Sequence, residues 1–468
     1  MQFFQDVQNA IFPELILLTG ILFLFILHFI EKEEKYQSCK AAVIITLIFS
    51  GISMFSIQIN PNYYVWHNNF IFNIFTLAFK VMILTGGIMA ATGNYSAAKL
   101  KPYKFFSLFL FGIFSAFCTV SANSFLSAFI SSNLLLSTIY FLLNLHPQKA
   151  CKISAKIFKN IFLSINTVFF AGILLLKLLT RTLNFLEFNI YDYYPAFIQL
   201  IFALITICML INISLYHFLQ AKFNVFQKTE LQTNLFITII SLFAQIALIS
   251  RAYIFVFSKF SGILTASTFA ALILTVFATI KLQKEKKIKK IYSLFTLISI
   301  GLTVPLLCSP NPYSISSAAF YVFVYLFTIT GLYTSAQTNN KEIVNKKDYA
   351  KLFVQKPFLT AAFCTLLLSF AGFPPAAGFI SRLYLCFAFS KINVLNSTIL
   401  AVILICTVFI SIHCFKFLKA VLTNEKIETL KHKWQNQLIV YFCSIVLIII
   451  FLFPNELVKI SQIIAYYI

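Results

Sequence analysis

Long apolar stretches recur along the whole of this 468-residue chain. Each is close to the roughly 20 residues that a helix needs to cross a bilayer. The charged fraction is only 11%, whereas soluble domains carry about 25% charged residues, so a water-soluble fold is excluded. We predict an all-α polytopic membrane protein with about 14 transmembrane helices. The expected spans are 12–30, 41–59, 70–91, 105–122, 124–145, 160–180, 195–219, 233–257, 262–280, 291–308, 315–336, 357–374 continuing to 390, 394–418 and 437–454.

The positive charges lie in alternate loops. A net charge of +22 is typical of proteins that bind nucleic acid, but most of the 36 basic residues fall in the odd-numbered loops, as in the runs 281–290 and 341–356. Loops that remain on the cytoplasmic or matrix side of a membrane carry such an excess. We therefore expect no nucleic-acid partner, and we place both termini on the opposite side, the intermembrane space or periplasm.

A proline pair interrupts one of the apolar stretches. Pro374 and Pro375 remove two backbone donors and clash with carbonyls one turn earlier, so a helix must break there. In hydrocarbon, non-helical backbone is tolerated only where protein or an internal water-filled cavity satisfies it. Arg382 follows roughly 10 Å further along if the helix resumes at 1.5 Å per residue. A broken helix beside a buried cation favours an ion-conducting membrane protein.

Few polar side chains are expected at bilayer depth, and none of them is acidic, because all 14 acidic residues fall at predicted helix ends or in loops. Lys80 should face protein or water, either as a structural lysine bonded to carbonyls or as part of a proton path. Asn133 and Gln245 can order water or join helices, but they cannot change charge. The polar residues expected at depth are Lys80, Asn133, Asn166, Gln199, Asn212, Gln245, Arg251, Arg382 and His413.

The sequence lacks the motifs that usually bind phosphate groups, metals or redox cofactors. It contains no glycine-rich phosphate loop, no CxxC spacing among its ten cysteines and no histidine cluster. We expect no metal, catalytic residue or redox cofactor in this chain. The first ten residues lack the basic start of a signal peptide, so the first helix should be retained.

Several motifs occur in the order found in one family. The segment 371–379 resembles an AGxPPxxGF helix break, and Arg382 stands where that family usually has lysine. The chain thus resembles the antiporter-like membrane subunits of respiratory complex I, which are related to sodium/proton antiporter subunits. The length and the opening Phe12-Pro13-Glu14 resemble the branch called subunit 2, or the N chain in bacteria. The other matching motifs are Ser121-Ala122-Asn123, Lys289-Lys290 through Gly301, Tyr321, Tyr325, Gly331, and Asp348-Tyr349 running to Pro357.

The resemblance implies a single membrane domain, 1–468, with inverted repeats at 104–258 and 262–418. It implies a subunit of proton-translocating NADH:ubiquinone oxidoreductase whose flavin, iron–sulfur clusters and quinone reside in other subunits. The implied partners are other complex I membrane subunits, including antiporter-like ones, and membrane lipids, with bound phospholipid as a candidate ligand. The implied location is the mitochondrial inner membrane, with the bacterial plasma membrane as the alternative.

This chain departs from the family at the positions proposed to handle protons. By this resemblance, Asn133 stands where the family has a glutamate and Gln245 where it has a lysine. A second family lysine and a nearby proline align near Leu210 and Leu215, just ahead of His217. Arginine stays protonated in proteins, so Arg382 would be a fixed charge rather than a relay. The proton-path candidates are Arg382, Asn133, Gln245, Lys80 and His217.

Three functions remain open at this point. The chain could conduct protons through its own half-channels. It could instead be a structural or coupling subunit of the same complex that no longer pumps, which the missing glutamate and lysine favour. A free-standing cation/proton antiporter subunit is the third.

Overall fold

The computed structural model describes residues 2–30, 36–55, 63–93, 95, 101–188, 196–309, 311–337, 343–345, 356–389, 394–422 and 434–468. Within them, 13 helices are long and apolar enough to cross a membrane. Two shorter apolar helices, α15 (Pro357–Ala371) and α16 (Ala377–Phe389), adjoin the proline pair. The described chain divides into two compact units, residues 1–216 with 228–265 and 467–468, and residues 217–227 with 266–466.

The first unit holds most of the N-terminal helices and one small hairpin. Its core helix, α10, is buried along nearly its whole length and packs on α3, α5 and α6. Its elements are α1 (Gln2–Ile30), α2 (Tyr36–Phe55), β1 (Tyr63–Val65), β2 (Phe70–Phe72), α3 (Ile74–Ala91), α5 (Pro102–Ser121), α6 (Phe125–Leu145), α7 (Lys149–Thr180), α8 (Phe185–Phe188), most of α9 (Ala196–Lys222), α10 (Leu231–Phe255) and η2 (Phe257–Lys259).

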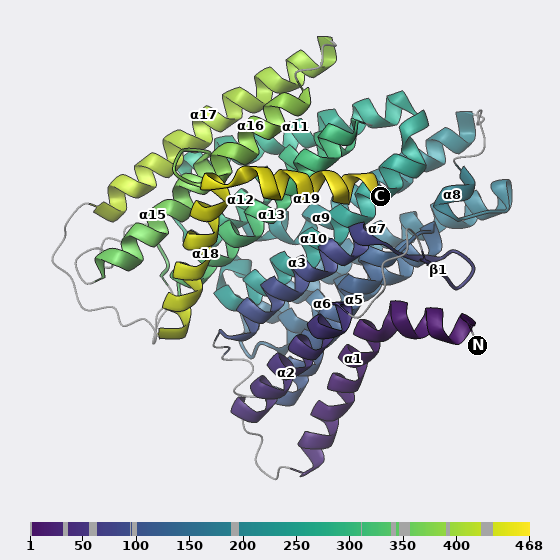
Figure 1. Cartoon of the computed structure of the whole chain (residues 1–468), viewed down its shortest axis with the longest axis horizontal. Coiled ribbons are helices and arrows are strands. Elements are labelled where there is room, and N and C mark those ends of the chain that lie inside the picture. Colours follow the sequence, from purple (N-terminus) through teal and green to yellow (C-terminus); the bar gives the residue numbers. More distant parts are fainter. Residues whose placement is uncertain are drawn as a thin grey trace. The chain divides into compact units, whose positions relative to one another are not determined.

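Local sequence explains where several of these helices begin. Asn73 and Ser124 cap α3 and α6, and in each case the third helical residue returns a side-chain hydrogen bond to the cap. The strands β1 and β2 pair antiparallel, with Tyr64 opposite Ile71. Helix α1 changes direction in its N-terminal part (Figure 1), as expected where Pro13 removes a backbone hydrogen bond. These features fix the hairpin and the start of α3 close to the N-terminal helix.

The second unit is built around α13, which packs on α12, α15, α16, α18 and α19. Asn311 caps α13, and Pro312 occupies its first turn, where a missing backbone donor costs nothing. Figure 1 shows that α19 leaves α18 at a steep angle after Pro454. The remaining elements are η1 (Asn224–Lys228), α11 (Ser261–Lys284), α12 (Ile288–Leu307), α13 (Pro312–Ser335), α17 (Val394–Leu422), α18 (Trp434–Leu452) and α19 (Pro454–Tyr466).

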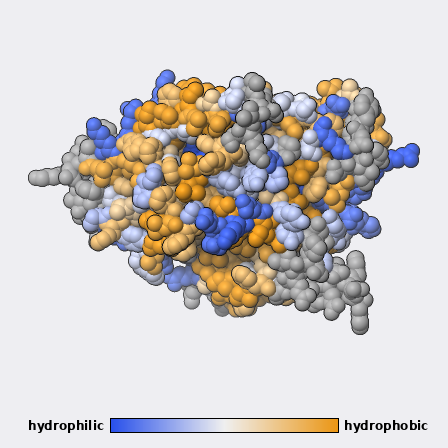
Figure 2. Space-filling view, turned by 45° about the horizontal axis from the view of Figure 1, so that its top comes forward, coloured by the Kyte–Doolittle hydropathy of each residue, from blue (hydrophilic) through white to orange (hydrophobic). Residues whose placement is uncertain are grey.

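Large apolar side chains cover much of the exposed surface. Phe55 is 89% exposed, and Phe29 and Phe358 are exposed almost as fully. Figure 2 shows hydrophobic residues over much of the face that it presents. Water does not tolerate contiguous apolar surface on this scale, whereas lipid tails do. The protein is therefore a multi-pass membrane protein.

The all-helical polytopic prediction is confirmed, including the broken twelfth helix. Two elements were not expected, namely the β1–β2 hairpin and the amphipathic α19. Helix α7 begins at Lys149, whereas the predicted span began at residue 160. The first turns of α7 carry basic residues, so they were not recognised as part of the apolar stretch. The Asp348-Tyr349 motif lies outside the described residues. The sidedness of the termini and the repeat boundaries stay predictions.

Candidate functional site

The chain leaves helical conformation between α15 and α16, in the second unit. Helix α15 ends at Gly372, whose φ of +79° lies in the left-handed region that glycine adopts readily. The Gly372 and Phe373 amides donate back to the Ser369 and Leu368 carbonyls, so the freed end of α15 is satisfied. Pro374 and Pro375 occupy the loop, and helical structure resumes at Ala377.

Gly378 lies against the end of α15. A Cβ built on Gly378 would lie 1.6 Å from the Ser369 carbonyl oxygen, which is backbone and cannot rotate away. The two halves of the broken helix can therefore approach this closely only because residue 378 has no side chain. This contact fixes where α16 starts relative to the end of α15.

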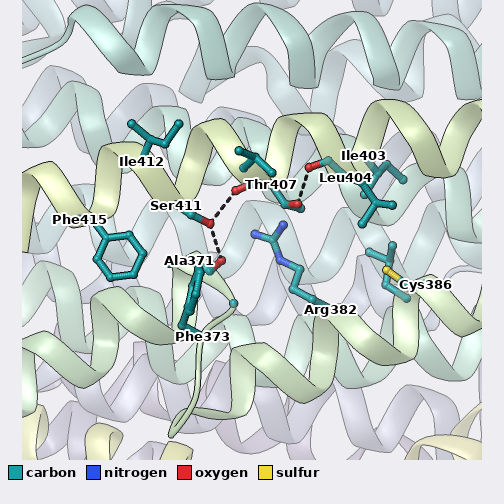
Figure 3. A pocket seen from close by; sticks show the side chains of 13 residues that line it. Ala371, Phe373, Arg382, Cys386, Ile403, Leu404, Thr407, Ser411, Ile412 and Phe415 are labelled. Atoms are coloured by element: carbon teal, nitrogen blue, oxygen red, sulfur yellow. Dashed lines mark hydrogen bonds between the residues drawn. The ribbon is translucent and has the colours of Figure 1, made fainter.

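Arg382 lies one turn after Gly378 and is buried. Its Nη2 donates to the Phe370 carbonyl over 3.0 Å, and its guanidinium carbon lies 5.9 Å from the centre of the Tyr321 ring. Its Nη1 has no hydrogen-bond partner among the residues that the structure describes. Arg382 lines a cavity of about 380 Å³ between α16 and α17, and Figure 3 shows its guanidinium pointing toward Thr407 and Ser411. Among the described residues, no carboxylate lies within ion-pair distance of Arg382.

Hydroxyl groups extend from Arg382 toward α12. The Tyr321 hydroxyl is 3.1 Å from Ser299 Oγ, and the Tyr325 hydroxyl donates to Thr296 Oγ1 over 3.1 Å. Tyr321 and Tyr325 are one turn apart on α13, and their rings are parallel. Such hydroxyls can both donate and accept a hydrogen bond. The region around Arg382 therefore combines a fixed positive charge, a cavity and hydrogen-bonding groups that carry no charge.

Lys80 lies in the first unit, buried on α3, and its partner is Glu14 on α1. The Lys80 Nζ is 2.5 Å from Glu14 Oε1, and the two side chains are only 3% and 5% exposed. The Lys80 Nζ also lies 4.1 Å from the centre of the Phe72 ring. The prediction that every acidic residue lies at a helix end or in a loop is wrong for Glu14. Helix α1 begins at Gln2 rather than residue 12, so Glu14 is well inside it.

Arg251 is fully buried on α10. Its Nη1 donates to the Val120 and Ala122 carbonyls, over 2.9 and 2.8 Å, at the C-terminal end of α5. The last carbonyls of a helix have no partner within it, and a cation near them is favourable. Arg251 therefore ties α10 to the end of α5, a role that its position in the sequence did not indicate.

Asn133 and Gln245, the two amides predicted to stand where the family has charged residues, are not joined in the described part of the chain. Asn133, half-buried on α6, donates its Nδ2 to the Phe129 carbonyl one turn earlier. Gln245 is buried on α10, and its Nε2 has no hydrogen-bond partner. Neither amide can take up or release a proton near neutral pH. Their roles as proton-path candidates stay predictions.

Other predicted polar residues lie at helix contacts. Asn212 on α9 donates to Asn166 on α7 over 3.5 Å, a contact of the kind that joins membrane helices. His217, near the end of α9, is fully buried in the second unit, as is His413 on α17. Asn133 and Gln245 belong to the first unit.

An ion pair between a histidine and a glutamate lies outside the membrane spans, and the pKa of the histidine is raised. His146 caps the end of α6, and its Nε2 lies 3.4 Å from the Glu230 carboxylate just ahead of α10. Its contacts with the Cys151 thiol and with Glu230 raise the pKa of His146 from its ordinary 6.5 to about 9. The protonated imidazole therefore favours the folded state at neutral pH.

We expect this pair to make stability depend on pH. Because folding raises the pKa of His146, its contribution is complete below pH 6.5 and is lost as the pH rises through about 9. The thermal midpoint of the purified protein should fall over this range, and His146→Gln should flatten that fall. His67→Gln, in the exposed hairpin turn, is the matched control. Parallel curves for wild type and His146→Gln would contradict the assignment.

Comparison with known sequences identifies one family. The sequence profile described as "NADH:quinone oxidoreductase/Mrp antiporter, TM" matches residues 122–411. The chain is 22% identical over 472 residues to NADH-quinone oxidoreductase subunit N of Bacillus anthracis, covering 94% of this chain and 92% of that one. It is 21% identical to the protein of the same name from Pelagibacter ubique, covering 97% of this chain and 98% of that one.

Comparison with solved structures gives the same fold. A chain of respiratory complex I from Thermus thermophilus superposes with a TM-score of 0.81 at 16% identity, covering 96% of this chain and 98% of that one. A chain of the Mrp complex from a Dietzia species superposes with a TM-score of 0.82 at 13% identity, covering 98% and 97%. At such identities the likeness establishes the fold alone.

Proposed function

Because this chain belongs to the NADH:quinone oxidoreductase/Mrp antiporter transmembrane family, we propose that it is a membrane subunit of a proton-translocating NADH–quinone oxidoreductase. The relatives that match it over nearly their full length carry the name subunit N of that enzyme. Their names support the same place for this chain, that of the subunit called 2 or N. The structures with the same fold come from multi-subunit membrane complexes.

The observation that carries the proposal is Arg382 beside the broken helix. A buried guanidinium with a free Nη1 facing a 380 Å³ cavity is costly unless water or an anion occupies that cavity. Since arginine does not release its proton, Arg382 acts as a fixed charge that orders water and sets the potential along the path. The hydrogen-bonded hydroxyls of Tyr321 and Ser299 continue the row of polar groups from Arg382 to α12. Protons would then move through water near Arg382 rather than through its side chain.

A second function is supported by the neutral side chains at Asn133 and Gln245. With no titratable group at these two positions, the path expected in the family is interrupted in the first unit. The chain would then be a structural or coupling subunit that passes conformational change to its neighbours without pumping. A free-standing cation/proton antiporter subunit is the third proposal.

The redox chemistry is assigned to partner subunits. The sequence has no CxxC spacing and no dinucleotide fingerprint, so we propose that flavin, iron–sulfur clusters and quinone bind elsewhere in the complex and that this chain alone catalyses nothing. The proposed neighbours are other antiporter-like membrane subunits and membrane lipids, including bound phospholipid. The bacterial relatives favour the plasma membrane as the location, with the mitochondrial inner membrane as the alternative.

The test is purification through an affinity tag on this chain from its native membrane in mild detergent. We expect the chain to co-purify with NADH:quinone oxidoreductase activity, and vesicles containing that complex to take up protons when NADH is added. A stable monomer without associated NADH oxidation would overturn the proposal and favour a free-standing transporter. An assembled complex whose proton uptake does not respond to substitutions in this chain would favour the structural role.

A further inference from the structure

The buried ion pair of Glu14 and Lys80 lies apart from Arg382, in the first unit, and faces a cavity of its own. We propose that Lys80 and Glu14 form an acid–base pair that exchanges a proton with water in this cavity. The inference rests on the proposed function, since it adds a second charged site to a proton-translocating subunit. It concerns a carboxylate that the sequence analysis predicted at a helix end.

The cavity beside the pair has two polar atoms in need of partners. It has a volume of about 230 Å³ and is bounded by α1, the β1–β2 hairpin and α5. Glu14 Oε2 and Ser121 Oγ are both buried and find no hydrogen-bond partner within the described part of the chain, and both residues line the cavity. A water needs a polar site with two or more partners, and the volume exceeds what a single water occupies. We therefore expect water here, hydrogen-bonded to the oxygen of Glu14 that Lys80 does not use.

The cavity also reaches the surface of the protein. Trp66, in the turn of the hairpin, is one of its lining residues and is 54% exposed. Phe70 and Phe72 line the cavity from β2, and the Phe72 ring also covers the Lys80 ammonium group. The hairpin thus forms one wall of the cavity beside the ion pair.

Charged and titratable groups from neighbouring elements surround the pair. Arg251 on α10 acts electrostatically on Lys80, and Cys118 on α5 is the other titratable neighbour. Tyr64 on β1 interacts with Arg251. Protonating Glu14 from outside the pair would therefore leave the Lys80 ammonium without its carboxylate.

The exchange can be written with its charges balanced. The Lys80 ammonium passes a proton to Glu14 Oε1 along the 2.5 Å hydrogen bond, which gives a neutral amine and a neutral carboxyl group. The carboxyl group then gives a proton to cavity water, which leaves the amine, the carboxylate and one hydronium ion. Proton uptake is the reverse. No redox partner is required, and Glu14 serves as the link between Lys80 and water.

The test is the neutral double variant Glu14→Gln/Lys80→Met in the assembled complex, reconstituted in vesicles. Replacing both members of a buried ion pair by side chains of similar size is often neutral for stability, so the complex should assemble. We expect NADH oxidation in detergent to be retained and most of the proton uptake per NADH to be lost. Glu456→Gln/Lys459→Met, which removes an exposed ion pair on α19, is the matched control and should behave as wild type.

The outcomes separate this inference from the proposed function. Wild-type proton uptake by the assembled Glu14→Gln/Lys80→Met complex, together with a loss in Arg382→Met, would overturn the acid–base pair and leave the proposed function standing. If neither variant changes proton uptake in an assembled complex, the acid–base pair fails and the chain is a structural subunit of that complex. Should the double variant fail to assemble, modification of Glu14 in the wild-type complex by a hydrophobic carbodiimide, read by mass spectrometry, decides. Modification that rises as the pH falls supports the pair, and an unmodified Glu14 at every pH overturns it.

Discussion

Gly378→Ala is expected to prevent assembly of the protein. The new Cβ would overlap the Ser369 backbone carbonyl oxygen at 1.6 Å, and both residues lie in helices that pack on other helices. Forcing extra volume into a packed core costs typically 1–3 kcal/mol, and a clash with backbone lies at or above the top of that range. The gain of about 1 kcal/mol from replacing glycine by alanine inside a helix is too small to offset it.

The matched control is Gly262→Ala on α11, where a Cβ would meet no atom within 4 Å. We expect it to be neutral or slightly stabilising, since only the helix propensity changes. The measurement is the yield of assembled complex and its thermal midpoint for the two variants. Equal yields and midpoints for Gly378→Ala and Gly262→Ala would show that the close contact between α15 and α16 does not determine the broken helix.

Removing one member of the Glu14–Lys80 pair should be far more damaging than removing both. Glu14→Gln alone leaves the Lys80 ammonium, 3% exposed, without a carboxylate. Breaking a buried pair in this way costs about 3–5 kcal/mol, whereas replacing the whole pair by neutral groups is often neutral. Both single variants should therefore lower the thermal midpoint of the complex sharply, and the Glu14→Gln/Lys80→Met double variant should recover most of it.

The two single variants and the double variant form a double-mutant cycle. Because both substitutions remove the same ion pair, their effects on stability should not be additive. Contacting residues show an interaction free energy of about 0.5–3 kcal/mol in double-mutant cycles, and here its sign should favour the double variant. A double variant whose loss equals the sum of the two single losses would mean that Glu14 and Lys80 do not stabilise each other. The ion pair would then be absent from the assembled protein.

The helices could be predicted because a bilayer demands long apolar stretches, and nothing local competes with that signal. Where helices carry charge, the prediction fell short. Helix α7 extends back over the basic residues from Lys149, and α19, with Glu456 and Lys459, has too mixed a composition to be recognised as a span. The β1–β2 hairpin has strands of only three residues, too short to show an alternating pattern.

The candidate site was only partly predictable. Pro374, Pro375 and Arg382 are neighbours in the sequence, so the broken helix and its cation could be inferred from local chemistry. Glu14 and Lys80 are 66 residues apart, and only the packing of α1 on its neighbours brings them together. The signal that could have indicated Glu14 is its place beside Pro13, directly before the long apolar stretch that starts at Leu15.

The most direct measurement is the number of protons taken up per NADH by vesicles that contain the assembled complex with Arg382→Lys or Arg382→Met. A fixed charge near cavity water predicts that Arg382→Lys keeps most of the wild-type ratio and that Arg382→Met loses a large part of it, while Arg181→Met, at an exposed position, changes nothing. A wild-type ratio in an assembled Arg382→Met complex would contradict a role for this charge in proton translocation and leave the chain a structural subunit.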